Sequence, residues 1–315
     1  MLLSDRIGRR MKLQDLHVLM AVVQAGSMSK GAVVLNTTQS AISRSIAELE
    51  QTIGVRLLDR GPQGVEPTEY GRALLECGVA VFDDLRRGMK NIEFLADPTA
   101  GETRIGCPPQ LAASFVSTVV DRLSRRYPRI VFHVVVGQLV DAQYRELFHR
   151  NVDLLIGRRF GSLVDQRTDY EFLFDDSYLV AAGTHNPWTR RRRIELAELA
   201  NEPWVLPPPP NSVVESVAKE AFLASGLDYP RTTVFSASPD VRMNLLATGR
   251  FISVIPDSVL KFSIRRPELK VLPVTQALSH MPVGIITLKN RTLSPVAQLF
   301  IDGAREVAKA PTKIK

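Results

Sequence analysis

The sequence predicts an α/β protein with an N-terminal winged helix-turn-helix, a long linker helix and two C-terminal α/β subdomains. Three observations support this fold class. Short amphipathic helical segments separated by turn signals occupy the first 60 residues, apolar residues then recur at steps of four and three, and strands alternate with helices beyond residue 101. A chain of 315 residues is also too long for one small core, which indicates several domains.

Composition excludes several classes of protein. The apolar content of 45% and the mixed charge are typical of a globular chain. With only Cys77 and Cys107, neither a disulfide framework nor a cysteine zinc site is expected, and a reducing compartment is indicated. Charges interrupt the first residues and no run of about 18 apolar residues occurs. We therefore expect a cytoplasmic protein that is neither exported nor membrane-spanning.

The net charge of +7 and the pI of 9.6 suggest a nucleic-acid partner only weakly. Residues 1–70 carry eight basic and seven acidic side chains, an excess of one. Whether the chain binds nucleic acid must therefore be judged from the positions of the charges rather than from their sum.

Two helices are predicted first. Gly26 ends the first helix, whose apolar residues at helical spacing are Leu13, Leu16, Leu19, Met20 and Val23. Ser27 or Ser29 can cap a short second helix that runs to about Leu35. This second helix is expected to bury Ala32, Val33 and Leu35.

A tight turn at Asn36 and Thr37 leads to a third helix, where the Thr38 hydroxyl can accept from the backbone N–H of Ser40 or Ala41. Two short helices joined by such a turn form a helix-turn-helix. The inward face comprises Ile42, Ile46, Leu49 and Ile53, which turns Gln39, Ser40, Ser43 and Arg44 outward. A recognition helix presents this end to the major groove, where Gln can pair with adenine and Arg with guanine.

A β-hairpin wing is predicted next, with one strand over Val55–Leu58, a turn at Pro62–Gly64 and a returning strand. Arg60 lies beside it, in position for a minor-groove or phosphate contact. A polar helix face alone is usually only a solvated surface, but here cap, turn, polar end and wing coincide. The DNA-contacting candidates are Ser27, Lys30, Thr38, Gln39, Ser40, Ser43, Arg44 and Arg60.

The stretch "GSMSKGAVVLNTTQSAISRSIAELEQTIGVRLLDRGPQGVEPTEYGRALL" resembles the N-terminal domain of LysR-type transcriptional regulators. The resemblance lies in the Gly-Ser before the second helix, the Gln and Ser of the third, "GVRLLDR", and the Pro-Thr-x-x-Gly after the wing. Two residues depart from the family pattern. Gly31 replaces a usual alanine, which costs about 1 kcal/mol of helix propensity, and Thr37 replaces an aliphatic residue.

A heptad seam follows over 70–95, formed by Leu74, Gly78, Val81, Leu85, Gly88, Ile92 and Leu95. An ordinary helix packed on its own chain would show the same pattern. The resemblance implies the dimerising linker helix of the family, with Leu74, Val81, Leu85, Ile92 and Leu95 in the dimer contact. It also implies a homodimer that assembles into a homotetramer and reads an interrupted inverted repeat in double-stranded promoter DNA.

Beyond the Pro and Gly of "ADPTAG", two successive sets of strands and helices indicate parallel α/β subdomains. The resemblance implies the periplasmic-binding-protein fold of the family's effector domain, up to about Ala308. The expected domains are residues 12–69 for DNA binding, 70–96 for the linker, 97–101 for a hinge and 102–308 for the effector domain. Subdomain I is expected at 102–170 and 290–308, and subdomain II at 171–289.

Ligands of open α/β sheets bind at the carboxyl ends of strands. By position in the family, the effector contacts are expected at Pro109, Gln110, Gln138, Arg158, Pro209, Asn211, Ser212 and Ser238. The planar fork of Arg158 could bind a carboxylate or phosphate, although a surface arginine beside Arg159 is the plainer interpretation. Gln110 replaces the small hydroxyl residue frequent in the family, so the effector is not identified.

No catalytic constellation is present: the five histidines are scattered, and no P-loop, G-x-S-x-G or G-x-G-x-x-G occurs. Neither a cofactor nor a metal is expected. Cys107 is interpreted as a small buried hydrophobe rather than a redox sensor, and Arg190–Arg193 as a solvated loop rather than a DNA patch. The sequence thus predicts a regulator controlled by a small-molecule effector. The alternative is a small-molecule-binding protein whose N-terminal domain mainly dimerises.

Overall fold

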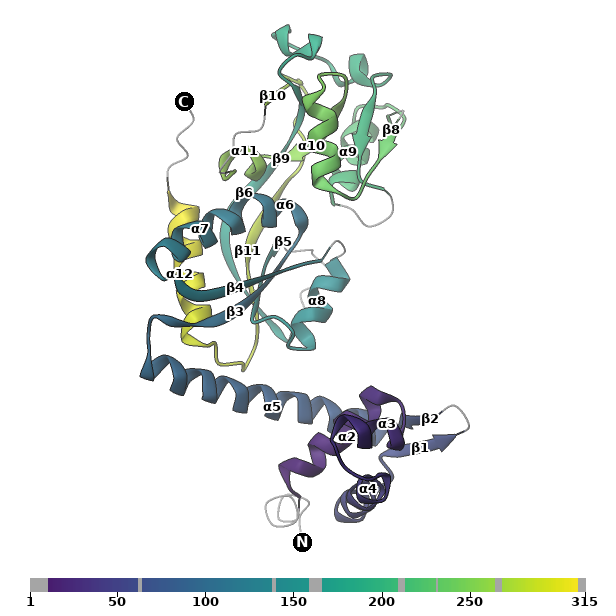
Figure 1. The fold of residues 1–315 in the computed structure, drawn as a ribbon. Helices are drawn as coiled ribbons and strands as arrows, with labels where there is room; N and C mark the ends of the chain where they lie inside the picture. The colour runs from purple at the N-terminus through teal and green to yellow at the C-terminus, as the bar shows by residue number, and fades with distance from the viewer. Residues whose placement is uncertain are drawn as a thin grey trace. The chain divides into compact units, whose positions relative to one another are not determined.

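The computed structural model describes residues 11–61, 64–137, 140–158, 166–208, 213–230, 232–263 and 268–310. The chain divides into two compact units, residues 1–86 and 87–315. Their boundary falls inside the long helix α5, Glu69–Ala96 (Figure 1). Each unit is described by itself below.

The N-terminal unit packs three helices and a hairpin around one apolar core. Its elements before α5 are α2 (Leu13–Ala25), α3 (Met28–Val34), α4 (Gln39–Ile53), β1 (Leu58–Gly61) and β2 (Gly64–Pro67). Gly26 ends α2 in the left-handed conformation, at φ 73°, and the Ser27 hydroxyl accepts the Lys30 N–H at 3.2 Å. The helix-turn-helix predicted from the sequence is confirmed.

Helix α3 buries Ala32 and packs Leu35 against the core as expected, but it exposes Val33. Met28, Gly31 and Ala32 point inward, whereas Val33 is 76% exposed and Leu35 is only partly buried. A Cβ atom on Gly31 would lie 3.0 Å from Cγ2 and 3.1 Å from Cα of Val22. The glycine therefore lets α3 approach α2 closely, which offsets its poor helix propensity.

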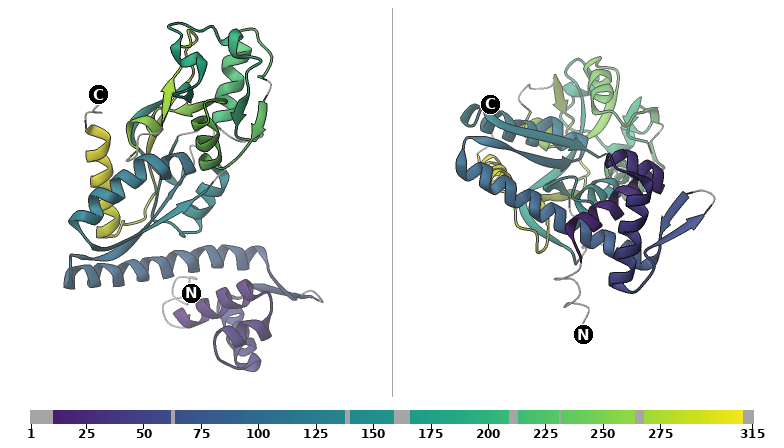
Figure 2. Two further views of the ribbon diagram at one scale, coloured as in Figure 1. Left: turned by 45° about the horizontal axis from the view of Figure 1, so that its top comes forward. Right: turned by 60° about the horizontal axis from the view of Figure 1, so that its bottom comes forward.

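The wing begins later than the expected strand at Val55–Leu58. The Glu50 carboxylate accepts the backbone N–H groups of Leu57 at 2.7 Å and Leu58 at 3.2 Å. The chain is thus held against α4 up to Leu58, and β1 pairs with β2 only from there onward. Pro62, in the expected turn, lies outside the described residues. The hairpin projects away from the helices (Figure 2).

The Pro-Thr-x-x-Gly motif closes this unit at the start of α5. The Thr68 hydroxyl accepts the Gly71 N–H at 3.1 Å, while the Thr68 N–H donates to the Leu57 carbonyl at 2.9 Å. A Cβ atom on Gly71 would lie 2.0 Å from that same carbonyl oxygen. Threonine thus caps the helix, and glycine leaves room for the strand that the cap holds.

The heptad residues of α5 divide into two groups. Leu74 packs against the core of the N-terminal unit, and Gly78 is buried beside Met20. Leu85, Ile92 and Leu95 are exposed, as is Met89, which the heptad reading had not included. The plainer interpretation therefore holds for the first heptad. Val81, in the next heptad, is half-buried, and the four exposed residues have no such cover among the described residues. Helix α5 ends at Ala96 and the next strand begins at Ala100, inside the segment expected to be a hinge.

The second unit is a mixed α/β structure on one continuous sheet (Figure 1). The order of the strands is β4-β3-β5-β11-β6-β9-β7-β8, with β10 paired to β6. The strands are β3 (Ala100–Cys107), β4 (Arg129–Val136), β5 (Leu154–Arg158), β6 (Thr168–Gly183), β7 (Trp204–Leu206), β8 (Thr232–Phe235), β9 (Ile252–Pro256), β10 (Leu269–Val271) and β11 (His280–Leu288).

Helices cover both faces of this sheet. They are α6 (Pro109–Leu111), the π-turn η1 (Ala112–Val116), α7 (Ser117–Arg126), α8 (Val140–Phe148), η2 (Pro187–Arg190), η3 (Leu196–Leu199), α9 (Val213–Ala224), α10 (Pro239–Ala247), α11 (Ser258–Lys261) and α12 (Pro295–Lys309). In subdomain I, α7 and α12 enclose one core and α8 encloses another on the opposite face. In subdomain II, α9 and α10 cover separate cores in the same way.

Two long strands join the subdomains, and the sequence had not indicated their full extent. The parallel pairs β3–β4, β3–β5, β7–β8 and β7–β9 agree with the prediction. However, β6 and β11 run antiparallel to their neighbours and pass from one subdomain to the other. The expected boundaries at 170/171 and 289/290 fall inside or beside these strands. The cores place Phe174 and Val283 in subdomain I, and Tyr178 and Met281 in subdomain II.

Replacing Gly71 with alanine tests the role of the motif. We expect Gly71→Ala to destabilise the N-terminal unit by about 1–3 kcal/mol, because the new methyl group collides with a backbone carbonyl that cannot rotate away. Urea denaturation followed by circular dichroism measures the change. Gly61→Ala is the matched control, because a Cβ atom there meets nothing within 4 Å. Equal stability of the two variants would contradict this account of the motif.

Candidate functional site

The first turns of α4 present polar side chains to solvent. Gln39, Ser40 and Arg44 are exposed and Ser43 is half-buried, while Ile42, Ile46 and Leu49 on the opposite face are buried. The Thr38 hydroxyl caps the helix by accepting the Ala41 N–H at 3.2 Å, and it lies 3.0 Å from the Ser40 hydroxyl. The expected cap and the expected division into two faces are thus both present.

Helix α4 is fixed on α2 by polar as well as apolar contacts. The Ser45 hydroxyl donates to Asp15 at 3.2 Å, and the other oxygen of this carboxylate accepts the Lys12 N–H at 3.0 Å. One carboxylate therefore joins the start of α2 to the middle of α4. This contact holds the exposed end of α4 in a defined orientation within its unit.

Three cations accompany this polar end in the same unit. Lys30 follows the cap of α3, Arg44 lies on α4 and Arg60 on β1, and all three are exposed. Within the part of the chain that the structure describes, no ion pair neutralises any of them. The partial positive charge at the N-terminus of α4 adds to theirs. The arrangement favours a polyanion with base edges to read, as double-stranded DNA offers.

A second candidate site lies where the two subdomains meet. Strand register places Arg158, at the end of β5, opposite Val283 of β11, and Pro256, at the end of β9, opposite Tyr178 of β6. Because β3 and β4 run with β5, and β7 and β8 run with β9, the carboxyl ends of all six strands point to the same crossover (Figure 1). Ligands of open α/β sheets bind at such edges.

Several expected effector residues lie at this edge. Pro109 and Gln110 are half-buried in α6, directly after β3, and Ser238 caps α10 after β8 by accepting the Val241 N–H at 3.4 Å. Other residues of the expected set fall outside the described part of the chain, namely Gln138, Pro209, Asn211 and Ser212.

Arg158 differs from both interpretations given to it. It is buried rather than on the surface, and its Nη2 donates to Asp176 at 2.5 Å. Asp176 also accepts the backbone N–H and the hydroxyl of Ser258, each at 2.8 Å. The planar fork therefore serves an internal ion pair that joins β5, the β6 crossover and α11. The signal that the sequence analysis did not use is Asp176, which adjoins the apolar half of β6 and is buried there.

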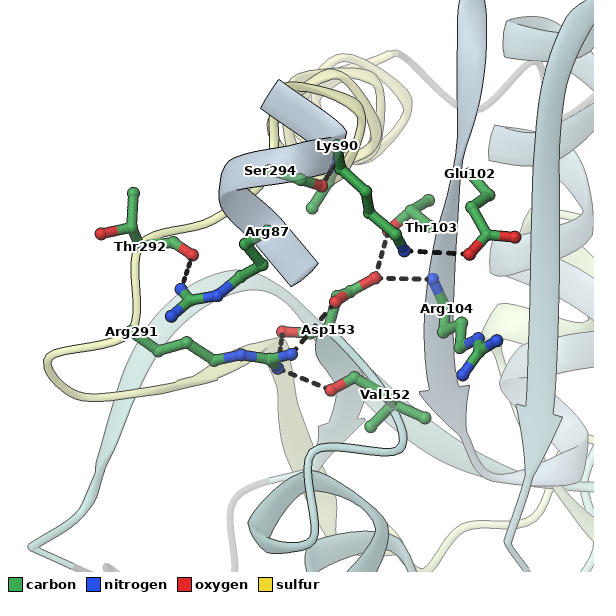
Figure 3. A network of polar contacts seen from close by, with 11 residues as sticks. Arg87, Lys90, Glu102, Thr103, Arg104, Val152, Asp153, Arg291, Thr292 and Ser294 are labelled. Atoms are coloured by element: carbon green, nitrogen blue, oxygen red, sulfur yellow. Dashed lines mark hydrogen bonds and ion pairs between the residues drawn. The ribbon is translucent and has the colours of Figure 1, made fainter. Parts of the chain in front are cut away.

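The second half of α5 is attached to subdomain I by a polar network (Figure 3). Arg87 donates to the Thr292 carbonyl, and Lys90 pairs with Glu102 at 3.0 Å. Beside this contact, Asp153 pairs with Arg291 at 3.2 Å. The other oxygen of Asp153 accepts from the side chain of Thr103 at 3.1 Å and the N–H of Arg104 at 2.9 Å. Displacement of subdomain I would carry this part of α5 with it.

The remaining sequence candidates have ordinary surroundings. Cys107 is fully buried, and burial raises the pKa of its thiol to about 12, which argues against a redox sensor. Arg190–Arg193 are exposed, and two of them pair with nearby glutamates. Among the described residues, no group of three or more His, Cys, Asp or Glu side chains could hold a metal ion. Nor does any described helix have the length and apolar character to cross a membrane.

The fold and the two sites together define a class of protein, a DNA-binding transcriptional regulator with a ligand-binding domain. Comparison with known proteins agrees. Residues 13–72 match the bacterial regulatory helix-turn-helix proteins of the lysR family, and residues 96–309 match the LysR substrate binding domain. The chain belongs to the LysR family, whose members are transcriptional regulators rather than enzymes.

Its relatives are similar over nearly their whole length. The HTH-type transcriptional regulator GbpR of Azospirillum brasilense is 26% identical over 97% of this chain and 89% of its own. The transcriptional dual regulator GltC of Bacillus subtilis is 26% identical over 93% of this chain and 96% of its own. Among solved structures, full-length CbnR complexed with its target DNA has a TM-score of 0.63 at 21% identity, covering 94% of this chain and 100% of that one. Members of the family bind promoter DNA and small-molecule effectors and form oligomers, whereas the alternative of a mainly dimerising N-terminal domain gains no support.

The ion pair between Arg158 and Asp176 can be tested by removing one partner. We expect Asp176→Ala to lower the free energy of unfolding by about 3–5 kcal/mol, because a buried guanidinium is left without its counter-charge. Urea denaturation of the full chain measures the loss. Arg193→Ala, which breaks an ion pair exposed to solvent, should leave the midpoint unchanged. Similar midpoints for both variants would show that the buried pair does not hold the crossover.

Proposed function

We propose that the N-terminal half of α4 reads the DNA sequence in the major groove, with Gln39 and Arg44 making the base contacts. The observation that carries this proposal is the division of α4 into a buried apolar face and an exposed polar end. Ser40 and Ser43 add hydrogen bonds to bases or phosphates. Phosphate contacts from Ser27, Thr38, Lys30 and Arg60 fix the register. Because the partner is chromosomal DNA, the protein acts in the cytoplasm.

The effector binds between the two subdomains, at the edge that includes Pro109, Gln110 and Ser238. A ligand that contacts both subdomains favours one relative orientation of the two, and a differential affinity of about 1–3 kcal/mol is enough to shift the population. Because Arg87 and Lys90 attach α5 to subdomain I, that shift changes how α5 is held. The spacing of the two DNA-binding domains of a dimer then changes, and with it the contact to promoter DNA.

The dimer forms along α5, through the exposed apolar residues Leu85, Met89 and Ile92. These residues lie at steps of four and three, so they share one face of the helix. Exposed apolar residues at such spacing are typical of a helix that packs against a partner. A homotetramer, as a dimer of dimers, follows from the family.

The DNA contact is tested by the double substitution Gln39→Ala with Arg44→Ala. Each lost bidentate contact removes about 1–3 kcal/mol of discrimination between bases, so specific binding to the promoter should disappear in a gel-shift assay while residual binding follows the salt concentration. Arg192→Ala is the control, because it removes a positive charge that is exposed in the effector domain. Specific binding that survives the double substitution would exclude this recognition mechanism.

The dimer contact is tested by placing aspartate at Leu85 and Ile92. Two buried charges per helix, four per helix pair, should convert the dimer to monomer, as measured by analytical ultracentrifugation, with the circular dichroism spectrum preserved. Arg86→Ala alters an exposed neighbour outside the apolar face and should leave the dimer intact. An unchanged dimer in the double variant would place the interface elsewhere.

A further inference from the structure

Arg242 is a buried cation at the edge where the effector is proposed to bind. It lies in the second turn of α10 and is only 3% exposed. It shares the inward face of this helix with Leu246, one turn later, which packs in an apolar core with Ala181 and Val205. The helical spacing therefore predicts an apolar residue at position 242, but an arginine occupies it.

Within the described part of the chain, the guanidinium of Arg242 has one hydrogen-bond acceptor and no counter-charge. Its Nη1 donates to the Ser236 carbonyl at 2.7 Å, whereas its Nε is buried without a hydrogen-bond partner. No carboxylate among the described residues pairs with it; Asp240, on the same helix, is exposed to solvent. Burial lowers the pKa of Arg242 to about 10, so the group still carries its charge at neutral pH.

Other buried arginines of the effector domain are compensated. Arg158 pairs with Asp176 at 2.5 Å, and Arg291 pairs with Asp153 at 3.2 Å. Leaving a buried charge unpaired is costly, and groups of this kind occur where function requires them. Because no carboxylate among the described residues pairs with Arg242, a carboxylate that is not part of the chain can supply its counter-charge.

The surroundings of Arg242 favour an anion. Its hydrogen bond to Ser236 places the guanidinium beside the loop that follows β8, at the edge that faces the crossover. The same loop leads into the N-terminus of α10, capped by Ser238, where the helix dipole adds positive potential. Two independent features, the unpaired cation and the helix end, therefore occur within one segment, Ser236 to Arg242.

We propose that Arg242 binds the acid group of the effector, which makes the effector a small organic carboxylate. The carboxylate replaces the missing counter-charge and accepts hydrogen bonds from the guanidinium, including its unpartnered Nε. This proposal rests on the proposed function in one respect, the location of the effector between the subdomains.

Matched pairs of acids and neutral amides test whether Arg242 binds a carboxylate. Succinate and benzoate are compared with succinamide and benzamide, and with inorganic sulfate and phosphate, by thermal shift and calorimetry on the full-length protein. At least one carboxylate should raise the melting temperature while its amide does not, and Arg242→Met should weaken that binding at least tenfold. Arg250→Met, an exposed arginine after the same helix, should bind as the parent chain does.

A second readout needs no ligand. If Arg242 serves the effector, its unpaired charge destabilises the empty protein, so the melting temperature of Arg242→Met without ligand should be equal to or above that of the parent chain. If the arginine only holds the loop at Ser236, the melting temperature of this variant should fall. A fall would overturn the proposal.

Three binding results would also overturn it. They are equal binding of acid and amide, binding of sulfate or phosphate alone, and no response to any of the acids. Failure of the proposed function would look different: a carboxylate would bind through Arg242 yet leave the DNA footprint unchanged.

Discussion

The geometry of the effector domain depends on the hydrogen bonds that the Asp176 carboxylate accepts. This carboxylate lies where β6 leaves one subdomain and enters the other, and it takes hydrogen bonds from Arg158 and from two groups of Ser258. These partners come from β5 and from the turn after β9, so one side chain fixes the carboxyl edges of both subdomains. Because the site is buried, the charge is tolerated only with all of these donors in place.

Helices α4 and α5 both carry apolar residues at helical spacing, but they use them differently. In α4 the apolar face is wide enough to hold the helix, and this leaves its first turns free to carry amide, hydroxyl and guanidinium groups in solvent. In α5 the first heptad packs against the core of the N-terminal unit, and Leu85, Met89, Ile92 and Leu95 beyond it are exposed. A single helix is thereby covered by its own chain at one end and exposes apolar side chains further on.

Local features of the fold could be predicted from the sequence, because their causes lie within a few residues. The cap at Thr38, the end of α2 at Gly26 and the face of α4 each depend on neighbours in one or two turns. Strand β11 was not predicted, since its partners lie more than a hundred residues earlier in the chain. The role of Arg158 was predicted wrongly for the same reason. Its ion pair with Asp176 is completed by Ser258, which lies 82 positions after Asp176 in the chain.

Candidate site residues also differ in whether local spacing or long-range packing reveals them. Those on α4 follow from spacing alone, whereas an arginine in "DVRMNLLATG" looks like one more solvated charge until the structure shows which face of α10 is buried.

Arg158 and Arg242 show why burial alone does not reveal the role of a charged residue. Both are buried at the same edge of the sheet, and both have an Nε without a hydrogen-bond partner. Arg158, however, faces a carboxylate supplied by the chain itself, so its charge is balanced whether or not a ligand is present. Among the described residues Arg242 contacts a carbonyl and no carboxylate, so in the proposed complex an anion balances its charge. The first arrangement stabilises a fixed crossover. The second makes the stability of the domain depend on ligand, and a ligand that binds one orientation of the subdomains more tightly then shifts the conformational equilibrium.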